Sequence, residues 1–451
     1  MEEKVVKGNM IVGNPMKLLV AFAAPMILGN LFQQFYNLMD SVIVGTWVGE
    51  DALAAVGASF SITMLFIMVA TGSGIGCSVV ISQFFGAKRN RDMKTSVYTA
   101  LIANFALGLV LSVVGLMINR GLLVLMKTPE NIMADAVTYL GIYFAGLVFL
   151  FMYNVISAIF NALGDSKKPL VFLICSSLLN IGLDLLFVIK FHWGVAGVAW
   201  ATLIAQGISA VVSFVFLIFK LKKIEHDGEP SLFDRTMMVR MVKIGIPTII
   251  QQSIVSIGML LVQVVINRFG SSVVAGYGAA MKIDSIAIVP MMAAGNAMST
   301  FTAQNIGAGR SERIKQGYKA CAIMVCIIGI VCAVILFLFG DSVLGLFLDA
   351  EESAVAFNTG MSYLHLVSLF YFVLGLFNLN NAVLRGAGDI LWFMSSTMSN
   401  LTIRVLFAFA FSGLLGPSAV WYSVPIGWAV GFIIGGIRYV SGKWKGKSLI
   451  T

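Results

Sequence analysis

The sequence predicts an all-α polytopic membrane protein with twelve transmembrane helices. Of its 451 residues, 59% are hydrophobic and only 11% are charged. The mean hydropathy is +0.93. The apolar residues gather in runs of about 20 to 30, long enough for a helix to cross a hydrocarbon core roughly 30 Å thick, whereas a membrane β-barrel shows short alternating segments. This composition excludes a water-soluble globular protein.

Short charged segments separate the apolar runs and set their limits. The first run carries Pro25 and one carboxylate, Asp40. It follows an N-terminus, MEEKVVKGNM, that lacks the apolar core of a signal peptide. We predict transmembrane helices at 16–49, 53–86, 95–118, 133–163, 169–190, 194–220, 238–268, 273–306, 316–340, 355–384, 390–413 and 417–440.

The net charge of +9 lies mainly in short loops beside the predicted spans. In that position basic residues set the membrane orientation and contact anionic lipid headgroups, so the charge does not indicate binding of nucleic acid. With the N-terminus inside, most of the 30 Lys and Arg residues lie on the inner side. We therefore expect a multi-pass protein of the plasma (cytoplasmic) membrane with both termini in the cytoplasm.

The chain contains two copies of one six-helix unit, offset by about 221 residues. We assign residues 1–220 to an N-lobe, 221–237 to a cytoplasmic linker and 238–451 to a C-lobe. Because six is even, both copies enter the membrane from the same side, and parallel repeats of this kind enclose a cavity at their interface. Matching positions include Gln83 with Gln304, Pro25 with Pro247, Gly164-Asp165 with Gly388-Asp389, and Asn180 with Asn400.

Two carboxylates fall at similar depth in the outer half of the N-lobe, Asp40 on the first span and Asp184 on the fifth. An ionised carboxylate inside a membrane costs at least about 2.5 kcal/mol, so each needs water or a partner. Oxygen-rich side chains around two acids suit Na⁺, or one proton shared between two like charges. Such side chains occur on the same and neighbouring spans, at Gln33, Tyr36, Asn37, Asn154, Asn180, Thr202 and Gln206.

A single Asn or Thr in a span is usually a satisfied hydrogen bond between helices. Two acids at matched depth instead favour a functional site. In the second repeat, Asp40 maps onto Leu261 or Val262, and Asp184 maps onto Arg404. We therefore expect ion coupling in the first lobe only.

Lys282, Asp284 and Arg404 remain as charges within the spans of the C-lobe. One interpretation is a structural cluster in which Asp284 neutralises one base. The other is that a base there repels cations or receives the anionic groups of a substrate.

Several features of the sequence point to a known family. They are the duplicated spans, Pro25 and Asp40 on the first helix, the loop from Gln83 to Arg89 with its counterpart at Gln304 to Arg310, and the run GVAGVAWAT from Gly194. Together they resemble the multidrug and toxic compound extrusion (MATE) family. The resemblance covers essentially the whole chain. It implies a V-shaped fold of two bundles, alternating access, and export of amphipathic, often cationic drugs in exchange for H⁺ or Na⁺, without a cofactor.

The resemblance also implies roles for particular residues. The first helix is expected to bend at Pro25. The substrate cavity is expected to include Gln33, Tyr36, Asn37 and Gln206. The coupling site is expected at Asp40, Asn154, Asn180, Asp184 and Thr202, with Na⁺ binding possible at Asp40, Asn180, Asp184 and Thr202.

Two other functions were compared with drug export. A lipid-linked oligosaccharide or lipid II flippase of the same superfamily usually has more spans and a more cationic central cavity, and an intramembrane enzyme would need a catalytic motif that the spans lack. We therefore expect a transporter and not an enzyme, working as a monomer in the lipid bilayer on small molecules. Whether H⁺ or Na⁺ is coupled stays open, because both suit carboxylates with amide and hydroxyl neighbours.

Overall fold

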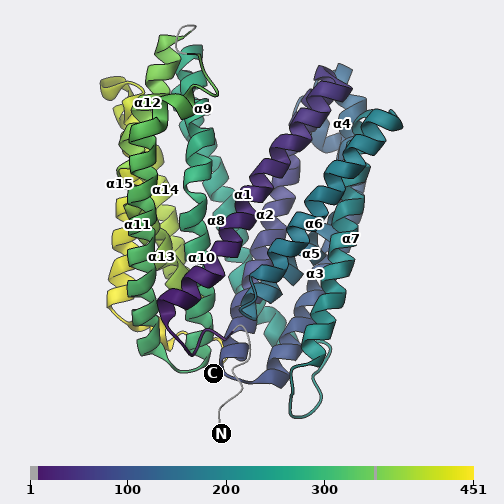
Figure 1. Ribbon diagram of the computed structural model, residues 1–451, viewed down its shortest axis with the longest axis vertical. Helices are drawn as coiled ribbons and strands as arrows, with labels where there is room; N and C mark the ends of the chain where they lie inside the picture. Colours follow the sequence, from purple (N-terminus) through teal and green to yellow (C-terminus); the bar gives the residue numbers. More distant parts are fainter. Residues whose placement is uncertain (1–8, 350–352, 451) are drawn as a thin grey trace. The chain divides into compact units, whose positions relative to one another are not determined.

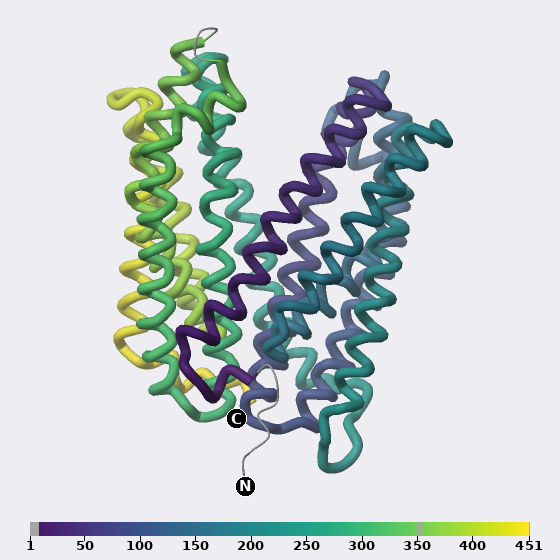
Figure 2. Tube along the Cα trace, in the orientation of Figure 1, coloured from purple at the N-terminus to yellow at the C-terminus, as the bar shows by residue number. Residues whose placement is uncertain are grey.

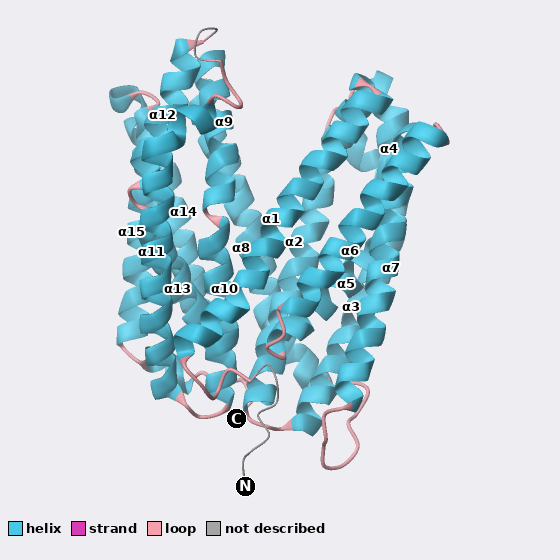
Figure 3. Ribbon diagram, viewed as in Figure 1, coloured by secondary structure: helices cyan, strands magenta, loops and turns pink. Residues whose placement is uncertain are grey.

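The computed structural model describes residues 9–349 and 353–450. In this part of the chain every regular element is a helix (Figure 3). This is expected in a membrane, where helices satisfy all backbone hydrogen bonds within one segment. The α-helices are α1 (Pro15–Ile43), α2 (Glu50–Gly86), α3 (Asn90–Leu125), α4 (Glu130–Ala145), α5 (Leu147–Ala162), α6 (Lys167–Asp184), α7 (Gly194–Lys222), α8 (Arg235–Asn267), α9 (Ser271–Ala287), α10 (Val289–Gly307), α11 (Ser311–Leu344), α12 (Ala354–Ser368), α13 (Tyr371–Ala387), α14 (Ile390–Leu415) and α15 (Ser418–Val440).

Among the described residues, ten helical segments are long and apolar enough to cross a membrane, and the number rises to twelve when two bent helix pairs each count as one span. The pairs are α4 with α5, bent by 49°, and α12 with α13, bent by 54°. The first bend falls at Gly146 and the second at Leu369–Phe370, which are matching places in the two repeats. The prediction of an all-α protein with twelve spans is confirmed.

Three short elements of other helix types complete the described fold. Two are π-helical turns that continue α1 and α6, namely η1 (Val44–Val48) and η2 (Leu185–Lys190). The third is a 3₁₀ turn near the C-terminus, η3 (Lys443–Gly446). A π turn takes up one more residue than an α turn and often marks a functional site.

The chain forms two compact units, and each is described by itself. Unit 1 contains residues 28–249, and unit 2 contains residues 10–27 and 250–450 of the described chain. Within each unit the helices run side by side (Figure 1). Small residues allow this close packing: a Cβ on Gly76 of α2 would lie 2.8 Å from Gly245 N of α8.

The first helix of each half therefore begins in the unit built mainly by the other half. In α1 the change of unit follows Ile27, and in α8 it follows Ile249. Both changes lie just beyond a proline inside the helix, Pro25 in α1 and Pro247 in α8. Figure 2 traces α1 in purple as one helix, and Pro25 lies inside its bounds.

Polar contacts hold the segment before α1 within unit 2. Met10 N donates to Gln304 Oε1 at 2.9 Å. Arg310 Nη1 donates to Ile11 O at 2.9 Å. Arg313 donates to Met10 O at 3.3 Å. The side chain of Met10 is buried in the same core.

The linker before α8 is held within unit 1 by contacts of the same kind. Asn90 Nδ2 donates to Glu225 O at 2.7 Å. Ser231 N donates to Thr95 Oγ1 at 3.1 Å. The two repeats therefore fix their leading segments in a similar way, each to helices of the opposite repeat.

Candidate ion-coupling site

The structure brings Asp40 of α1 and Asp184 of α6 together inside unit 1. Their carboxyl groups lie within hydrogen-bond reach of each other. Asp184 is fully buried, and Asp40 is partly buried. Neither Asp40 Oδ1 nor Asp184 Oδ1 has a hydrogen-bond donor in the described protein. Two carboxylates at this separation cannot both stay ionised without a proton or cation between them.

Asn180 connects the acid pair to α1 and α7. With its amide nitrogen facing Asp184, it donates to Asp184 Oδ2 at 2.9 Å and to Tyr36 Oη at 3.3 Å. Its amide oxygen then accepts from Thr202 N at 3.0 Å. This orientation gives both ends of the amide a partner. Three of the predicted coupling residues and Tyr36 therefore belong to one hydrogen-bonded group.

Two tyrosines border the carboxyl groups. Tyr36 interacts electrostatically with both acids and lines the same cavity as Thr202. Tyr139 of α4 also interacts electrostatically with both acids. Tyr139 gives no functional signal in the sequence, because a tyrosine in a span is usually a core or interface residue.

Both acids lie next to the π turns. Asp184 is the last residue of α6 before η2, and Asp40 lies one turn before η1. Val44 of η1 and Val188 of η2 are buried in one hydrophobic cluster. The acid pair therefore sits where two irregular turns pack together, a feature for which hydropathy gives no signal.

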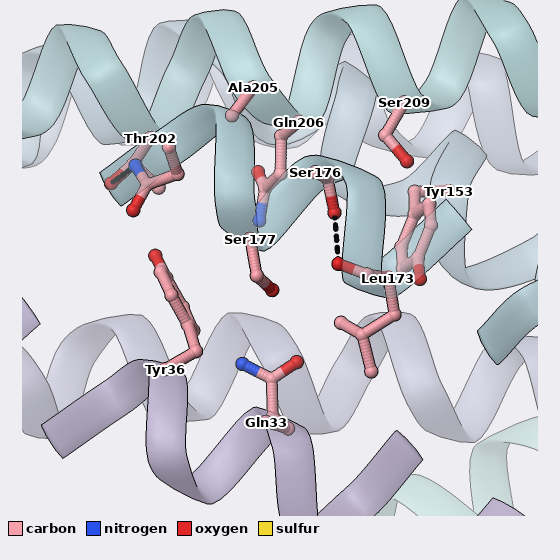
Figure 4. Close-up of a pocket in the computed structure, with 11 residues that line it drawn as sticks. Gln33, Tyr36, Tyr153, Leu173, Ser176, Ser177, Thr202, Ala205, Gln206 and Ser209 are labelled. Atoms are coloured by element: carbon pink, nitrogen blue, oxygen red, sulfur yellow. Dashed lines mark hydrogen bonds between the residues drawn. The ribbon is translucent and has the colours of Figure 1, made fainter. Parts of the chain in front are cut away.

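A cavity of about 70 Å³ lies next to the hydrogen-bonded group, because Tyr36, Asn180 and Thr202 line it. Asp40 and Asp184 are not among its lining residues. Gln33 and Tyr36 approach it from α1, and Thr202 and Gln206 approach it from α7 (Figure 4). The volume suits a few waters or an ion, whereas drug-sized pockets measure about 300 to 1,000 Å³. The lining residues are Gln33, Tyr36, Tyr153, Leu173, Ser176, Ser177, Asn180, Thr202, Ala205, Gln206 and Ser209.

Three of the four predicted substrate-cavity residues therefore line one polar cavity. The fourth, Asn37, is exposed and accepts a hydrogen bond of 3.2 Å from Gln33 Nε2. Sequence reasoning missed the serines at 176, 177 and 209, because Ser is common between packed helices. Contact of any of these residues with a substrate stays a prediction.

Asn154 and Pro25 are not part of the hydrogen-bonded group. The Asn154 amide donates to Leu150 O of its own helix at 2.9 Å. Pro25 lies inside α1, close to the point where α1 changes unit. A coupling role for Asn154 and a hinge role for Pro25 both stay predictions.

The donor set around the acids suits an alkali cation or a proton better than a transition metal. Among the described residues, no three His, Cys, Asp or Glu side chains gather as a metal site would require. Carboxylate, amide and hydroxyl oxygens are the ligands that hard cations prefer.

Comparison with known proteins places this geometry in a family. The model of the family MatE matches residues 25–186 and again residues 247–410. The chain belongs to the MatE family. Each match covers one repeat, which confirms the internal duplication, and the MATE resemblance of the sequence is confirmed.

Relatives cover this MATE chain almost completely. A Bacillus subtilis protein named "Probable multidrug resistance protein YpnP" is 32% identical over 97% of this chain and 98% of its own length. A solved outward-facing multidrug resistance MATE transporter is 26% identical, with a TM-score of 0.89 over 98% of this chain and 100% of its own. A MOP superfamily transporter from Pyrococcus furiosus, described as having a binding pocket of reverse polarity, is 27% identical, with a TM-score of 0.88 over 98% and 100%.

The MATE matches correct one detail of the repeat alignment. From the paired Gly164-Asp165 and Gly388-Asp389, the chain continues without a break through α6 and α14. A shift inside a continuous helix would rotate its faces, so the residues stay in step. Asp184 therefore pairs with Ala408 and Asn180 pairs with Arg404. The pairings of Asp184 with Arg404 and of Asn180 with Asn400 are both wrong. The two matches end in the same register, at 186 and 410.

The charges of the second repeat do not form one cluster. Lys282 is exposed and lies over the Phe347 ring at 5.6 Å. Asp284 is buried and interacts electrostatically with Arg404. Arg404, and not Lys282, is therefore the base that interacts with Asp284, and neutralisation of one base by Asp284 stays a prediction.

Proposed function

We propose that this protein is a secondary active efflux antiporter, which exports amphipathic, often cationic compounds in exchange for H⁺ or Na⁺ by alternating access. The observation that carries the proposal is the contact of two acids from α1 and α6 in the interior of unit 1. The names of the multidrug relatives support the class of substrate.

The acid pair can convert ion binding into movement of α1. When both carboxylates are ionised they repel, and when a proton or Na⁺ lies between them α1 and α6 approach. Asn180 transmits this change, because it donates both to Asp184 and to Tyr36 of α1. The ion favours one conformation only if it binds that conformation more tightly than the other.

The available driving force is adequate for export. One elementary charge that moves through about 100 mV provides about 2.3 kcal/mol. This free energy corresponds to a concentration ratio of about 50-fold for an exported compound. This ratio applies to an uncharged compound exchanged for one ion. One-for-one exchange with a monovalent cationic compound moves no net charge, so the concentration gradient of the ion then drives export.

We place the protein in the plasma membrane as a monomer with both termini in the cytoplasm. The excess of Lys and Arg in the loops on one side supports this orientation.

The test is efflux of ethidium from proteoliposomes in which Na⁺ and pH gradients are imposed separately. Asp40→Asn should lower gradient-driven efflux at least about 10-fold, since one half of the acid pair no longer binds a cation. Asp135→Asn, which changes an exposed acid on α4, is the matched control and should retain efflux. Unchanged efflux by folded Asp40→Asn protein would contradict the proposal. The gradient that drives the wild-type protein identifies the ion.

A further inference from the structure

The second unit holds a buried acid whose surroundings resemble part of the first site. Asp284 of α9 is only 5% exposed. Tyr371 Oη donates to Asp284 Oδ1 at 2.7 Å, and Tyr363 Oη donates to Asp284 Oδ2 at 3.4 Å. In the corrected register, Tyr363 of α12 pairs with Tyr139 of α4, which interacts electrostatically with the acid pair. Equivalent helices of the two repeats thus each carry a tyrosine that interacts with a buried carboxyl group.

A permanent positive charge lies near this acid. Arg404 of α14 pairs with Asn180 of α6, so a guanidinium replaces the amide that serves the acids of unit 1. Arg404 interacts electrostatically with Tyr277 and Asp284, and its buried Nε has no hydrogen-bond acceptor in the described part of the chain. Tyr277 is fixed by a stack on Trp421, with ring centroids 5.6 Å apart. Arginine is not deprotonated in proteins, so this charge is constant.

The charges of the two units differ in one respect. Unit 1 has two acids in contact and needs a cation from solution. Unit 2 has one buried acid, Asp284, and one base, Arg404, that interacts with it electrostatically. We propose that Arg404 is a built-in counter-cation that takes the place of the exchanged ion in the second repeat. Ion coupling is confined to the first repeat because the second repeat is permanently in its cation-loaded form.

The proposal predicts a hidden site for a monovalent cation. Without the Arg404 charge, the Asp284 carboxylate would be surrounded by tyrosine hydroxyls and would take up H⁺ or Na⁺. A buried Asp284 carboxylate with no positive charge near it should destabilise the folded protein until a cation binds. The titratable and charged side chains that face Asp284 or its partners are Tyr277, Tyr363, Tyr371, Arg404, and Cys332 of α11 next to Tyr371.

The test uses the full-length chain in which Asp40→Asn and Asp184→Asn have already removed the cation response of unit 1. Melting of purified protein is followed by tryptophan fluorescence. One series varies pH from about 5 to 9 without Na⁺, and another exchanges choline for Na⁺ at a fixed high pH. Arg404→Gln should lower the melting temperature at high pH by at least about 3 °C, and acid or Na⁺ should restore it. Arg404→Lys, which keeps the charge, is the matched control and should show no response.

Adding Asp284→Asn should remove both the loss of stability and the cation response of Arg404→Gln. If Arg404→Gln alone fails to fold while the variant with Asp284→Asn folds, the proposal is also supported. An Arg404→Gln protein that melts alike at every pH and Na⁺ concentration would overturn it, as would a response that survives Asp284→Asn, or failure of both variants to fold. If only acid restores the melting temperature of the Arg404→Gln protein, the cation bound at Asp284 is H⁺. If Na⁺ restores it, the site binds Na⁺. Because the acid pair is absent from this background, the outcome is independent of the transport proposal.

Discussion

At the scale of single residues, Asn180 joins α1, α6 and α7 through its side-chain hydrogen bonds. Its amide nitrogen contacts Asp184 and Tyr36, and its amide oxygen contacts the α7 backbone at Thr202. A hydrogen bond to a charged group is worth about 1.5 to 3 kcal/mol. Asn180 should therefore help to determine how tightly the acid pair holds its cation.

Replacement of Asn180 by leucine keeps the size of the side chain but removes these hydrogen bonds. The concentration of the coupling cation that gives half-maximal efflux should rise about 10-fold or more. Initial rates of ethidium efflux, measured across a series of Na⁺ concentrations or pH values, check this expectation.

The matched control is Asn154→Leu. Within the described residues the Asn154 amide donates to Leu150 O of its own helix, so the half-maximal cation concentration should change less than about threefold. An equal change in the two variants would return Asn154 to the coupling site and weaken the role of Asn180.

At the scale of elements, α1 and α8 are distinctive because each belongs to both units. A proline has no backbone N–H, so Pro25 leaves the carbonyl of Ala21 without its usual helical donor. Pro247 does the same to Lys243 in α8. Both weakened turns lie next to the residue at which the helix changes unit. These are the places where a helix bends most easily.

Pro25→Ala should stiffen α1. The variant should melt at the same or a higher temperature than the wild type, whereas its maximal efflux rate should fall several-fold because the bend costs more free energy. The combination of melting curves and efflux from proteoliposomes measures both effects.

Pro290→Ala provides the comparison. Pro290 lies in the first turn of α10, where a missing N–H has no helical partner to lose. Efflux should be nearly unchanged, and a similar loss in both variants would show that proline removal, and not the hinge position, is responsible.

The long periodic elements and the acid pair could be predicted because hydropathy and buried charge are strong signals in a membrane. Asp40 and Asp184 could be matched by counting residues from the predicted ends of their spans. The bends at Gly146 and Leu369–Phe370 and the two π turns could not, since they change neither composition nor length. The repeat partner of Arg404 was assigned wrongly, because matching a few similar residues placed a gap in the alignment. The continuous helix α14 leaves no room for such a gap.

At the scale of the whole molecule, the two repeats share one arrangement of helices, and amino-acid differences between them decide which repeat carries the acid pair. Both repeats match the same family model, yet the acids Asp40 and Asp184 occur only in the first. An even number of spans in each repeat also places the ends of both repeats on one side of the membrane.

The orientation of the termini can be measured with reporters fused after Thr451 in a bacterial host. Green fluorescent protein should fluoresce there, and alkaline phosphatase should be inactive, because its disulfides form only outside the cytoplasm. The opposite pair of results would reverse the membrane orientation that the basic loops predict.

The leading segments give the molecule an interlocked connectivity. The fragment before the linker carries the start of α1, which is packed in unit 2, and the fragment after it carries the start of α8, which is packed in unit 1. A protease site inserted between Asp227 and Gly228 should therefore yield two fragments that co-purify in mild detergent after cleavage. Fragments that separate freely would contradict this exchange. Because each half contributes its first helical turns to the unit built mainly by the other half, we expect the halves to stay together after the covalent link is cut.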